Sequence, residues 1–399
     1  MNQIDRKLFP VLLLCLALLL SACAGSAAPK EETPQSAPSA AAATSTAEGA
    51  APELPGLTYE RAMEKRYAEQ FNVYYYEGGY KYLAIGDGNN YLLVPEGKPV
   101  PEGLDPTVQV LSQPFKNIYL AGSATMALFD AMDALDVIRL SSIEEDKWYV
   151  ANAAAAMARG DMLYGGKYSE PDYELLLDCD IDLAIENTMI LHTPKVIEMI
   201  ENVGVPVFID YSSYEPHPLG CTEWIKLFGA MLDREDAAEA FFEQRAAAVE
   251  RMKEFQGTDA TVAIFLVDTT GKAQVRSSDD YLSRMIEIAG GKNAFAYAVD
   301  ENSGRTNVNM TMEEFYATAV DVDYLIYNSS GYSTGVDTLP ELLEKSDLLA
   351  DCRAVREGNV WWIGPETYQR TDERSAMIED MHRMLTGETE GMTFLHRME

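Results

Sequence analysis

Histidine and basic residues are scarce in this sequence of 399 residues. The four histidines, at positions 192, 217, 382 and 396, include no pair spaced to ligate a metal on one helix, which argues against a bare metal ion as ligand. Lysine and arginine number 31 against 64 acidic residues, giving a formal net charge of −33. Because nucleic acid requires a basic face, this charge balance excludes it as a partner.

Two familiar catalytic motifs are missing as well. Neither H-E-x-x-H nor the phosphate-binding G-x-x-x-x-G-K occurs in the chain. A G-x-G spacing from Gly86 to Gly88 falls in an expected hairpin turn, whereas a nucleotide site needs it between a strand and a helix. We therefore expect no enzyme, no catalytic residue, no metal site and no cofactor.

Cysteine is too sparse for a disulfide framework. Cys15 lies in the apolar N-terminal stretch and Cys23 directly follows it, which leaves Cys179, Cys221 and Cys352 in the body of the chain. These three are odd in number and have no C-x-x-C spacing, so we expect buried structural thiols.

The amino terminus has the pattern of an export signal. Arg6 and Lys7 precede an apolar stretch over residues 8–20, which is shorter than the roughly 20 residues of a membrane span. It ends in Leu20-Ser21-Ala22-Cys23, which looks like a bacterial lipobox. We expect a signal peptide over 1–22, lipidation at Cys23, and an extracytoplasmic protein anchored to the cell membrane.

The remaining chain divides by composition and pattern. Residues 23–56 are rich in Ala, Ser, Thr, Pro and Glu, as in a disordered tether. Aromatic and branched runs at 71–76, 80–85 and 91–94, separated by turn sequences, predict a small β-meander within an extension over 57–115.

After the extension, short strands alternate with amphipathic helices. This β-α-β pattern predicts two α/β lobes with parallel sheets, over 116–218 and 257–399. No strand interrupts 219–256, so a long helical element is expected to join the lobes. The matching sequences 182–187 and 323–328 share Asp, Ile and Asn at identical spacing, which suggests that the two lobes are similar.

Several of these segments, in this order, resemble the helical-backbone class of substrate-binding proteins of ABC transporters, which serve ferric siderophores, haem and cobalamin. Residues 118–125 resemble the first strand and turn of that family, 165–175 the segment before a later strand, and 234–255 its connecting helix. The resemblance implies two Rossmann-like lobes joined by a long rigid helix. The β-meander is not part of the usual core of the family.

The resemblance also implies partners. The first is a small-molecule ligand: a ferric siderophore by preference, with haem and a corrinoid left open. The second is an ABC permease, docked through one acidic residue on each lobe; Glu174 and Glu313 match by motif position. A lipid-anchored sensor or adhesin that keeps the fold without transport is the competing interpretation.

Ligands of open α/β sheets bind beyond the carboxyl ends of the strands. The loops expected there are rich in aromatic residues, which bury a planar ligand, and in arginines, which bind anionic oxygens. Since Trp361 and Trp362 are adjacent in a strand, only Trp362 is taken as a ligand contact. The predicted ligand-binding residues are Tyr149, Asn187, Tyr211, Tyr214, Arg276, Tyr281, Arg305, Trp362, Tyr368 and Arg370.

Overall fold

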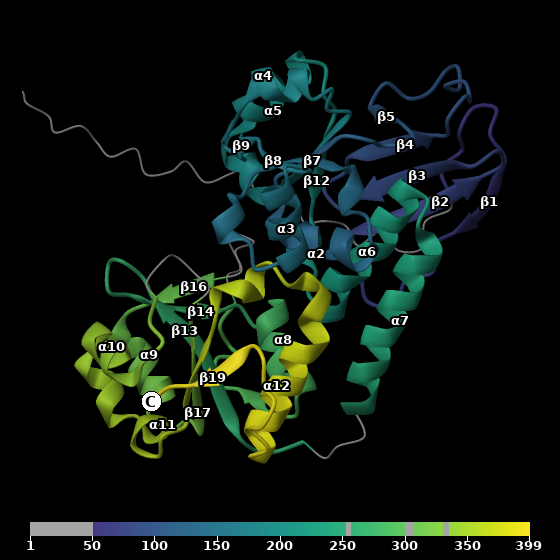
Figure 1. Ribbon diagram of the computed structural model, residues 1–399. Helices are drawn as coiled ribbons and strands as arrows, with labels where there is room; N and C mark the ends of the chain where they lie inside the picture. Colours follow the sequence, from purple (N-terminus) through teal and green to yellow (C-terminus); the bar gives the residue numbers. More distant parts are fainter. Residues whose placement is uncertain (1–50, 253–256, 300–306, 330–334) are drawn as a thin grey trace, which may run out of the picture. The chain divides into compact units, whose positions relative to one another are not determined.

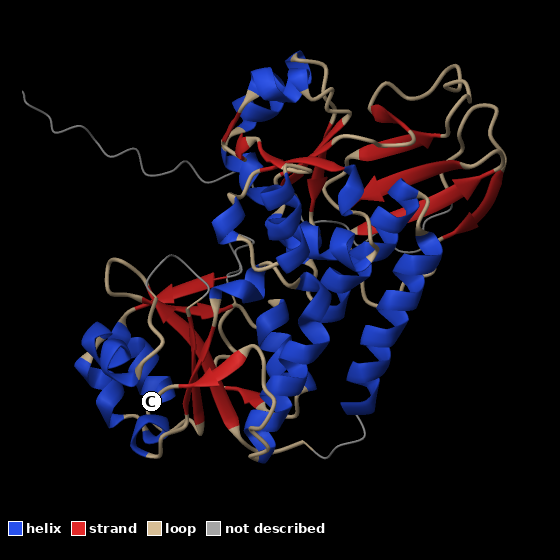
Figure 2. Cartoon of the chain, in the orientation of Figure 1, coloured by secondary structure: helices blue, strands red, loops and turns tan. Residues whose placement is uncertain are grey.

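The structure is a computed structural model, and it describes residues 51–252, 257–299, 307–329 and 335–399. The predicted signal peptide, most of the tether and Cys23 therefore lie outside the described residues. Three larger β-sheets, one two-stranded sheet and flanking helices make up the described part (Figures 1 and 2). This mixed α/β architecture confirms the predicted fold class.

The extension forms a five-stranded sheet in the order β1-β2-β3-β4-β5. Its neighbouring strands are antiparallel except β4 and β5, which run parallel. The three central strands confirm the predicted meander, whereas the fully exposed β1 has no apolar alternation that would predict it. The strands are β1 (Tyr59–Ala62), β2 (Phe71–Tyr76), β3 (Tyr80–Ile85), β4 (Asn90–Val94) and β5 (Val108–Ser112).

Lobe 1 contains a five-stranded sheet in the order β12-β11-β6-β7-β8, with every pair parallel. This arrangement is the one that the β-α-β alternation predicts. Its strands are β6 (Ile118–Leu120), β7 (Ile138–Ser141), β8 (Leu163–Tyr164), β11 (Leu183–Asn187) and β12 (Val207–Asp210), with a short hairpin of β9 (Gly166–Lys167) and β10 (Glu170–Pro171). Its helices are α2 (Ser123–Ala131), α3 (Ala151–Arg159), α4 (Tyr173–Asp178) and α5 (Pro194–Asn202).

Helix α2 is shorter than its apolar spacing predicts. The pattern extends to Leu135, but α2 ends at Ala131 and Leu135 lies in a 3₁₀ turn. The chain turns at Asp133, whose φ of 54° is left-handed and incompatible with a continuing helix. Ser123 is also not the N-cap: Gly122 holds that position without a side-chain hydrogen bond.

Two helices, α6 (Pro218–Leu232) and α7 (Glu235–Met252), follow lobe 1 and pack against each other. Asp233 was expected to cap the start of the second helix; instead it closes α6 in the left-handed region, with φ 55°. The long α7 runs from the side of the extension towards lobe 2 (Figure 1). It is the long connecting helix that the family resemblance implies.

Buried carboxylates fasten the extension to α6. Five consecutive backbone N–H groups, at residues 66–70, donate to the Glu223 and Glu215 carboxylates at 2.7–2.9 Å. Glu215 also accepts from Trp224 Nε1 at 2.8 Å, and both glutamates are almost fully buried. Charge-assisted hydrogen bonds of this kind compensate the cost of burying a carboxylate.

Lobe 2 has a mixed sheet in the order β16-β14-β13-β17-β18-β19, with β15 beside β13. Strands β13, β17 and β18 are parallel, as predicted, while the parallel β15 and the antiparallel β14, β16 and β19 are additions that the sequence patterns do not predict. The strands are β13 (Thr261–Val267), β14 (Ala273–Arg276), β15 (Lys292–Asn293), β16 (Asn307–Met310), β17 (Tyr324–Asn328), β18 (Val360–Ile363) and β19 (Leu395–Arg397).

Helices cover both faces of the lobe 2 sheet. Figure 1 shows α8 (Tyr281–Ile288) and α12 (Arg374–Thr386) on one side. On the other side lie α9 (Met312–Ala319), α10 (Leu339–Lys345) and α11 (Arg353–Arg356). Trp361 packs with the first group and Trp362 with the second, so the expected alternation is confirmed.

The two lobes share one hydrogen-bonding arrangement at the matching sequences 182–187 and 323–328. Asp182, just before β11, accepts the backbone N–H groups of Lys116 and Asn117, which precede the paired strand β6. Asp323, just before β17, accepts the N–H and hydroxyl of Thr261, where the paired strand β13 begins. Each aspartate thus ties the starts of two parallel strands together, which supports the similarity of the lobes.

Candidate ligand-binding site

The predicted residues of lobe 1 lie at or just beyond the carboxyl ends of its strands. Asn187 is the last residue of β11; its Oδ1 accepts from Met189 N at 2.8 Å and its Nδ2 donates to Ala121 O at 3.3 Å. Both polar ends of this amide therefore hold the loops after β11 and β6. Asn187 therefore fixes the loops at this edge of the sheet, where the ligand is expected.

Tyr211 and Tyr214 follow β12 and lie together, with ring centroids 5.8 Å apart. The preceding Asp210 is buried, accepting the Thr125 hydroxyl and Ser212 N, and burial raises its pKa. Burial also raises the pKa of Tyr211, and the Asp87 carboxylate of the extension adds to the effect. Tyr214 is 44% exposed, so this pair offers an accessible aromatic surface.

Arg276, Tyr281 and Tyr368 of lobe 2 are brought together in the structure. Arg276 Nη2 donates to the Tyr368 hydroxyl at 2.8 Å. Its Nη1 lies 3.6 Å from Asp280 Oδ2. Arg276 was predicted in a loop, but it is the buried last residue of β14, which pairs antiparallel with β13 outside the predicted β-α-β alternation. Asp280 is the N-cap of α8, and Tyr281 is its first residue.

A second buried arginine joins this group. The Arg374 guanidinium lies over the Tyr281 ring, 4.5 Å from its centroid, and Nη2 donates to the Tyr281 hydroxyl at 3.4 Å. Asp280 and Arg374 were not predicted as site residues; Asp280 pairs with Arg276 four residues before it, whereas the contact of Arg374 with Tyr281 joins distant parts of the chain. With Arg276, they make a polar cluster of two guanidinium groups and one carboxylate, which we call the arginine cluster.

The other predicted residues are more scattered. Tyr149 is 47% exposed, and Arg370 is already paired with Asp372, at 2.9 and 3.0 Å, and with Glu373. Trp362 lies on the sheet face covered by α9–α11, beside His396 and apart from the arginine cluster. Arg305 lies outside the described residues.

Glu186 is a buried acid that the sequence analysis did not single out. It is the fourth residue of β11 and is 0% exposed, and neither carboxylate oxygen has a hydrogen-bond partner. Burial raises its pKa from 4.5 to about 8. The only signal in the sequence is an acid within the apolar run 183–186, which alone does not distinguish a buried from an exposed position.

The predicted docking residues hold equivalent positions. Glu174 and Glu313 are the second residues of α4 and α9, the helices that precede the corresponding strands β11 and β17. Both side chains are exposed. The structure thus offers one accessible acid at the same place in each lobe.

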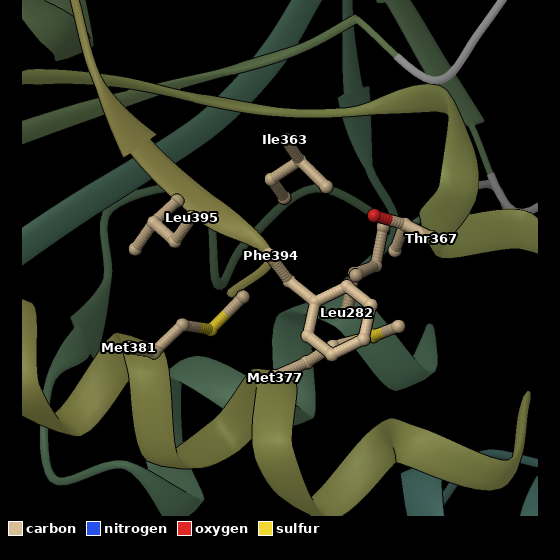
Figure 3. Close-up of a pocket in the computed structure, with 7 residues that line it drawn as sticks. All are labelled: Leu282, Ile363, Thr367, Met377, Met381, Phe394 and Leu395. Carbon is tan, nitrogen blue, oxygen red and sulfur yellow. The ribbon is translucent and has the colours of Figure 1, made fainter. Parts of the chain in front are cut away.

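A small cavity between α8, α12, β18 and β19 is not the ligand site (Figure 3). Its volume is about 10 Å³, close to the minimum for one water molecule. The close-up shows mainly apolar side chains around it, with the Thr367 hydroxyl as the one polar group, fewer than the two to four partners that a buried water needs. It is a packing gap in the core of lobe 2, lined by Leu282, Ile363, Thr367, Met377, Met381, Phe394 and Leu395.

Other features of the described residues bear on chemistry. None of the helices described is long and apolar enough to cross a membrane. Cys221 and Cys352 are buried free thiols, as expected, while Cys179 is half-buried. A G-x-S-x-G spacing, the pattern around some hydrolase nucleophiles, runs from Gly331 to Gly335, and its serine falls in the segment 330–334, outside the described residues.

Comparison with known proteins identifies the family. A model described as periplasmic binding protein matches residues 143–367, more than half of the chain. The chain therefore belongs to the periplasmic binding protein family, and the resemblance seen in the sequence is confirmed. Members of this family and the similar solved structures are solute-binding proteins.

Solved structures show the same fold at low sequence identity. The periplasmic haem-binding protein HutB of Vibrio cholerae superposes with a TM-score of 0.55 at 17% identity, over 69% of this chain and 99% of that one. A protein of an Fe³⁺-hydroxamate transport system from Saccharomonospora viridis superposes with a TM-score of 0.51 at 18% identity. The match covers 68% of this chain and 93% of that one. Both leave part of this chain unmatched.

Two similar curated proteins are uncharacterized lipoproteins of Methanocaldococcus jannaschii. The first is 26% identical over 207 residues, which cover 45% of this chain and 48% of the relative. The chain thus spans about half the length of that relative. The second is 26% identical over 314 residues, which cover 76% of this chain and 77% of the relative.

Proposed function

We propose that this protein is the extracytoplasmic, lipid-anchored binding component of an ABC importer, and that it captures a ferric siderophore between its two lobes. The observation that carries the proposal is the arginine cluster, where Arg276, Arg374 and Asp280 leave one net positive charge among tyrosines. Such a cluster suits an anionic ligand with a large aromatic or apolar face.

Exposed aromatic side chains support the same ligand class. Tyr149, Tyr164, Tyr214 and Tyr297 are each more than a third exposed and lie in or beside loops that follow strands of the two sheets. Their rings are accessible, so they are available to contact an aromatic or apolar face of a ligand. We assign ligand contact to Tyr149, Asn187, Tyr211, Tyr214, Arg276, Tyr281, Arg305, Tyr368 and Arg370, while Trp362 is the weakest of the predicted contacts.

The names of similar proteins agree with this choice of ligand. HutB is named as a haem-binding protein and the Saccharomonospora viridis protein belongs to an Fe³⁺-hydroxamate system. Haem and corrinoids also combine a broad apolar surface with anionic groups, so they are the alternative ligands. The lipoprotein relatives support lipidation at Cys23.

Delivery to the permease is assigned to the two exposed acids. Glu174 and Glu313 lie at matching helix starts, so together they can pair with two basic sites on a two-fold partner. A sensor or adhesin would have no need of such a pair. Loss of docking without loss of ligand binding therefore separates these two functions.

The test is a titration of the full chain in detergent with ferric desferrioxamine B, ferric enterobactin, haemin and cyanocobalamin, followed by tryptophan fluorescence. We expect saturable binding of one ferric siderophore at micromolar concentration or tighter, and at least tenfold weaker binding by Arg276→Ala. Arg284→Ala, which removes an exposed arginine of α8, is the matched control. If only haemin or only cyanocobalamin binds, that compound replaces the ferric siderophore as the proposed ligand. If none of the four compounds binds, the proposal is refuted.

A further inference from the structure

One side chain bridges the two lobes at the edges assigned to the ligand. Gln369 follows the 3₁₀ helix η6 (Pro365–Tyr368) after β18 of lobe 2. Its Nε2 donates to Lys147 O at 2.9 Å, and its Oε1 accepts from Tyr149 N at 2.8 Å. The amide is 8% exposed, and both its ends bond to the backbone of lobe 1.

The position of this bridge connects the predicted ligand contacts. Lys147 ends the 3₁₀ helix η2 (Glu145–Lys147), which follows β7 in lobe 1. Gln369 lies between Tyr368 and Arg370, and its partner Tyr149 is itself a proposed contact. The bridge thus joins the lobe 1 part of the site to the lobe 2 part.

The residues after Gln369 are fixed to the connecting helices. The Thr222 hydroxyl of α6 donates to Thr371 O at 2.8 Å, and Arg245 of α7 bonds Glu373 at 2.7 Å. These bonds hold the segment against α6 and α7, and η7 (Thr371–Glu373) also contacts α2 of lobe 1. Within the described residues, Gln369 supplies the two hydrogen bonds between this segment and the loop 147–149.

Two neutral hydrogen bonds are strong enough to favour a closed arrangement and weak enough to break reversibly. When they open, water replaces each partner, so the net stabilisation is modest. A buried salt bridge in the same place would be costly to separate. The chemistry of the glutamine amide therefore suits a latch.

We propose that Gln369 is an interlobe latch, a positioning residue that holds the loop 147–149 of lobe 1 against the Tyr368 segment of lobe 2. The latch itself is independent of the ligand, while its effect on ligand retention rests on the proposed function. Loss of both bonds should speed dissociation of a bound probe about tenfold, with little change in the association rate.

The first test needs no ligand. Hydrogen exchange of the Tyr149 amide, measured by mass spectrometry on the full chain, should become at least tenfold faster in Gln369→Ala. The matched control is Gln113→Ala: Gln113 is 7% exposed and donates to Met231 O at 2.9 Å, away from lobe 2. It should leave exchange at Tyr149 unchanged. If Gln369→Ala does not fold, Gln369→Met replaces the amide with a side chain of similar size.

The second test measures retention. Stopped-flow dissociation of ferric desferrioxamine B and of haemin should be faster in Gln369→Ala and unchanged in Gln113→Ala. Unchanged Tyr149 exchange in the Gln369 variants refutes the latch, and so does equal acceleration by the Gln113 control. If the wild-type protein binds none of the probes, the proposed function fails, while the exchange result still decides the latch.

Discussion

The buried Glu186 predicts a protein that loses stability as the pH rises. Its carboxyl is fully buried without a hydrogen-bond partner, and its pKa is raised from 4.5 to about 8. Below pH 4.5 the group is protonated in both the folded and the unfolded chain. Between pH 4.5 and about 8 only the unfolded chain releases the proton, so the free energy of unfolding falls as pH rises.

The size of this effect follows from the pKa difference. Each pH unit in that window changes the free energy of unfolding by about 1.4 kcal/mol, so the full loss is on the order of 4 kcal/mol by pH 8. Glu186→Gln keeps the size and polarity of the protonated acid but does not titrate. We expect the variant to match the wild type near pH 4 and to be more stable by several kcal/mol at pH 8.

Urea unfolding of the full chain at pH values from 4 to 8.5 provides the measurement. The control is Glu223→Gln, at an equally buried glutamate whose carboxylate accepts three backbone N–H groups from residues 66–68. That variant should lose about 1–3 kcal/mol at pH 7, since an amide oxygen is a weaker acceptor. A Glu186→Gln variant whose advantage does not grow between pH 4.5 and 8 would refute the reasoning.

Three further predictions concern docking, the extension and the anchor. Reversing both docking charges, Glu174→Arg with Glu313→Arg, should abolish cellular uptake of the bound probe at unchanged affinity; Asp178→Arg, on the exposed side of α4, should leave uptake intact. Lys81→Ala should lower the free energy of unfolding at pH 7 by about 2 kcal/mol in a urea titration. The variant loses a buried side chain of the extension and its hydrogen bond from Nζ to Ala230 O. Cys23→Ser should move the protein from the membrane to the soluble fraction, and a variant that stays membrane-bound would contradict lipidation.

The sequence predicted lobe 1 better than lobe 2, and the reason is strand order. In the lobe 1 sheet every strand is parallel and a helix separates consecutive strands, so hydrophobic periodicity predicts β6, β7, β11 and β12, whereas the two-residue strands β8, β9 and β10 fall in a segment predicted as a loop. In lobe 2, β14, β16 and β19 pair in antiparallel fashion, outside the β-α-β alternation that predicted the other long strands. Their pairing with β13, β14 and β18 is set by tertiary contacts that local patterns do not contain.

The sequence predicted several residues of the candidate site by their type, but not the hydrogen bonds and ion pairs that join them. Arginines and tyrosines after strands suggested Arg276, Tyr281 and Tyr368, which the structure brings together. Asp280 was missed because an aspartate at a helix start has an ordinary explanation in capping, and Arg374 was missed because its contact with Tyr281 is long-range. Only the fold shows that they are buried against Arg276 and Tyr281.

The fastening of the extension has a consequence for how the chain can be divided. A protein that begins at residue 116, where lobe 1 starts, would retain Glu215 and Glu223 but lose all five N–H groups at 66–70 that satisfy them. Glu215 would keep the Trp224 Nε1 donor and Glu223 the Lys226 ammonium 3.6 Å away, but neither would keep its backbone donors. The extension therefore completes the hydrogen bonding of these two acids, and a shortened protein restricted to the two lobes should be less stable than the full chain.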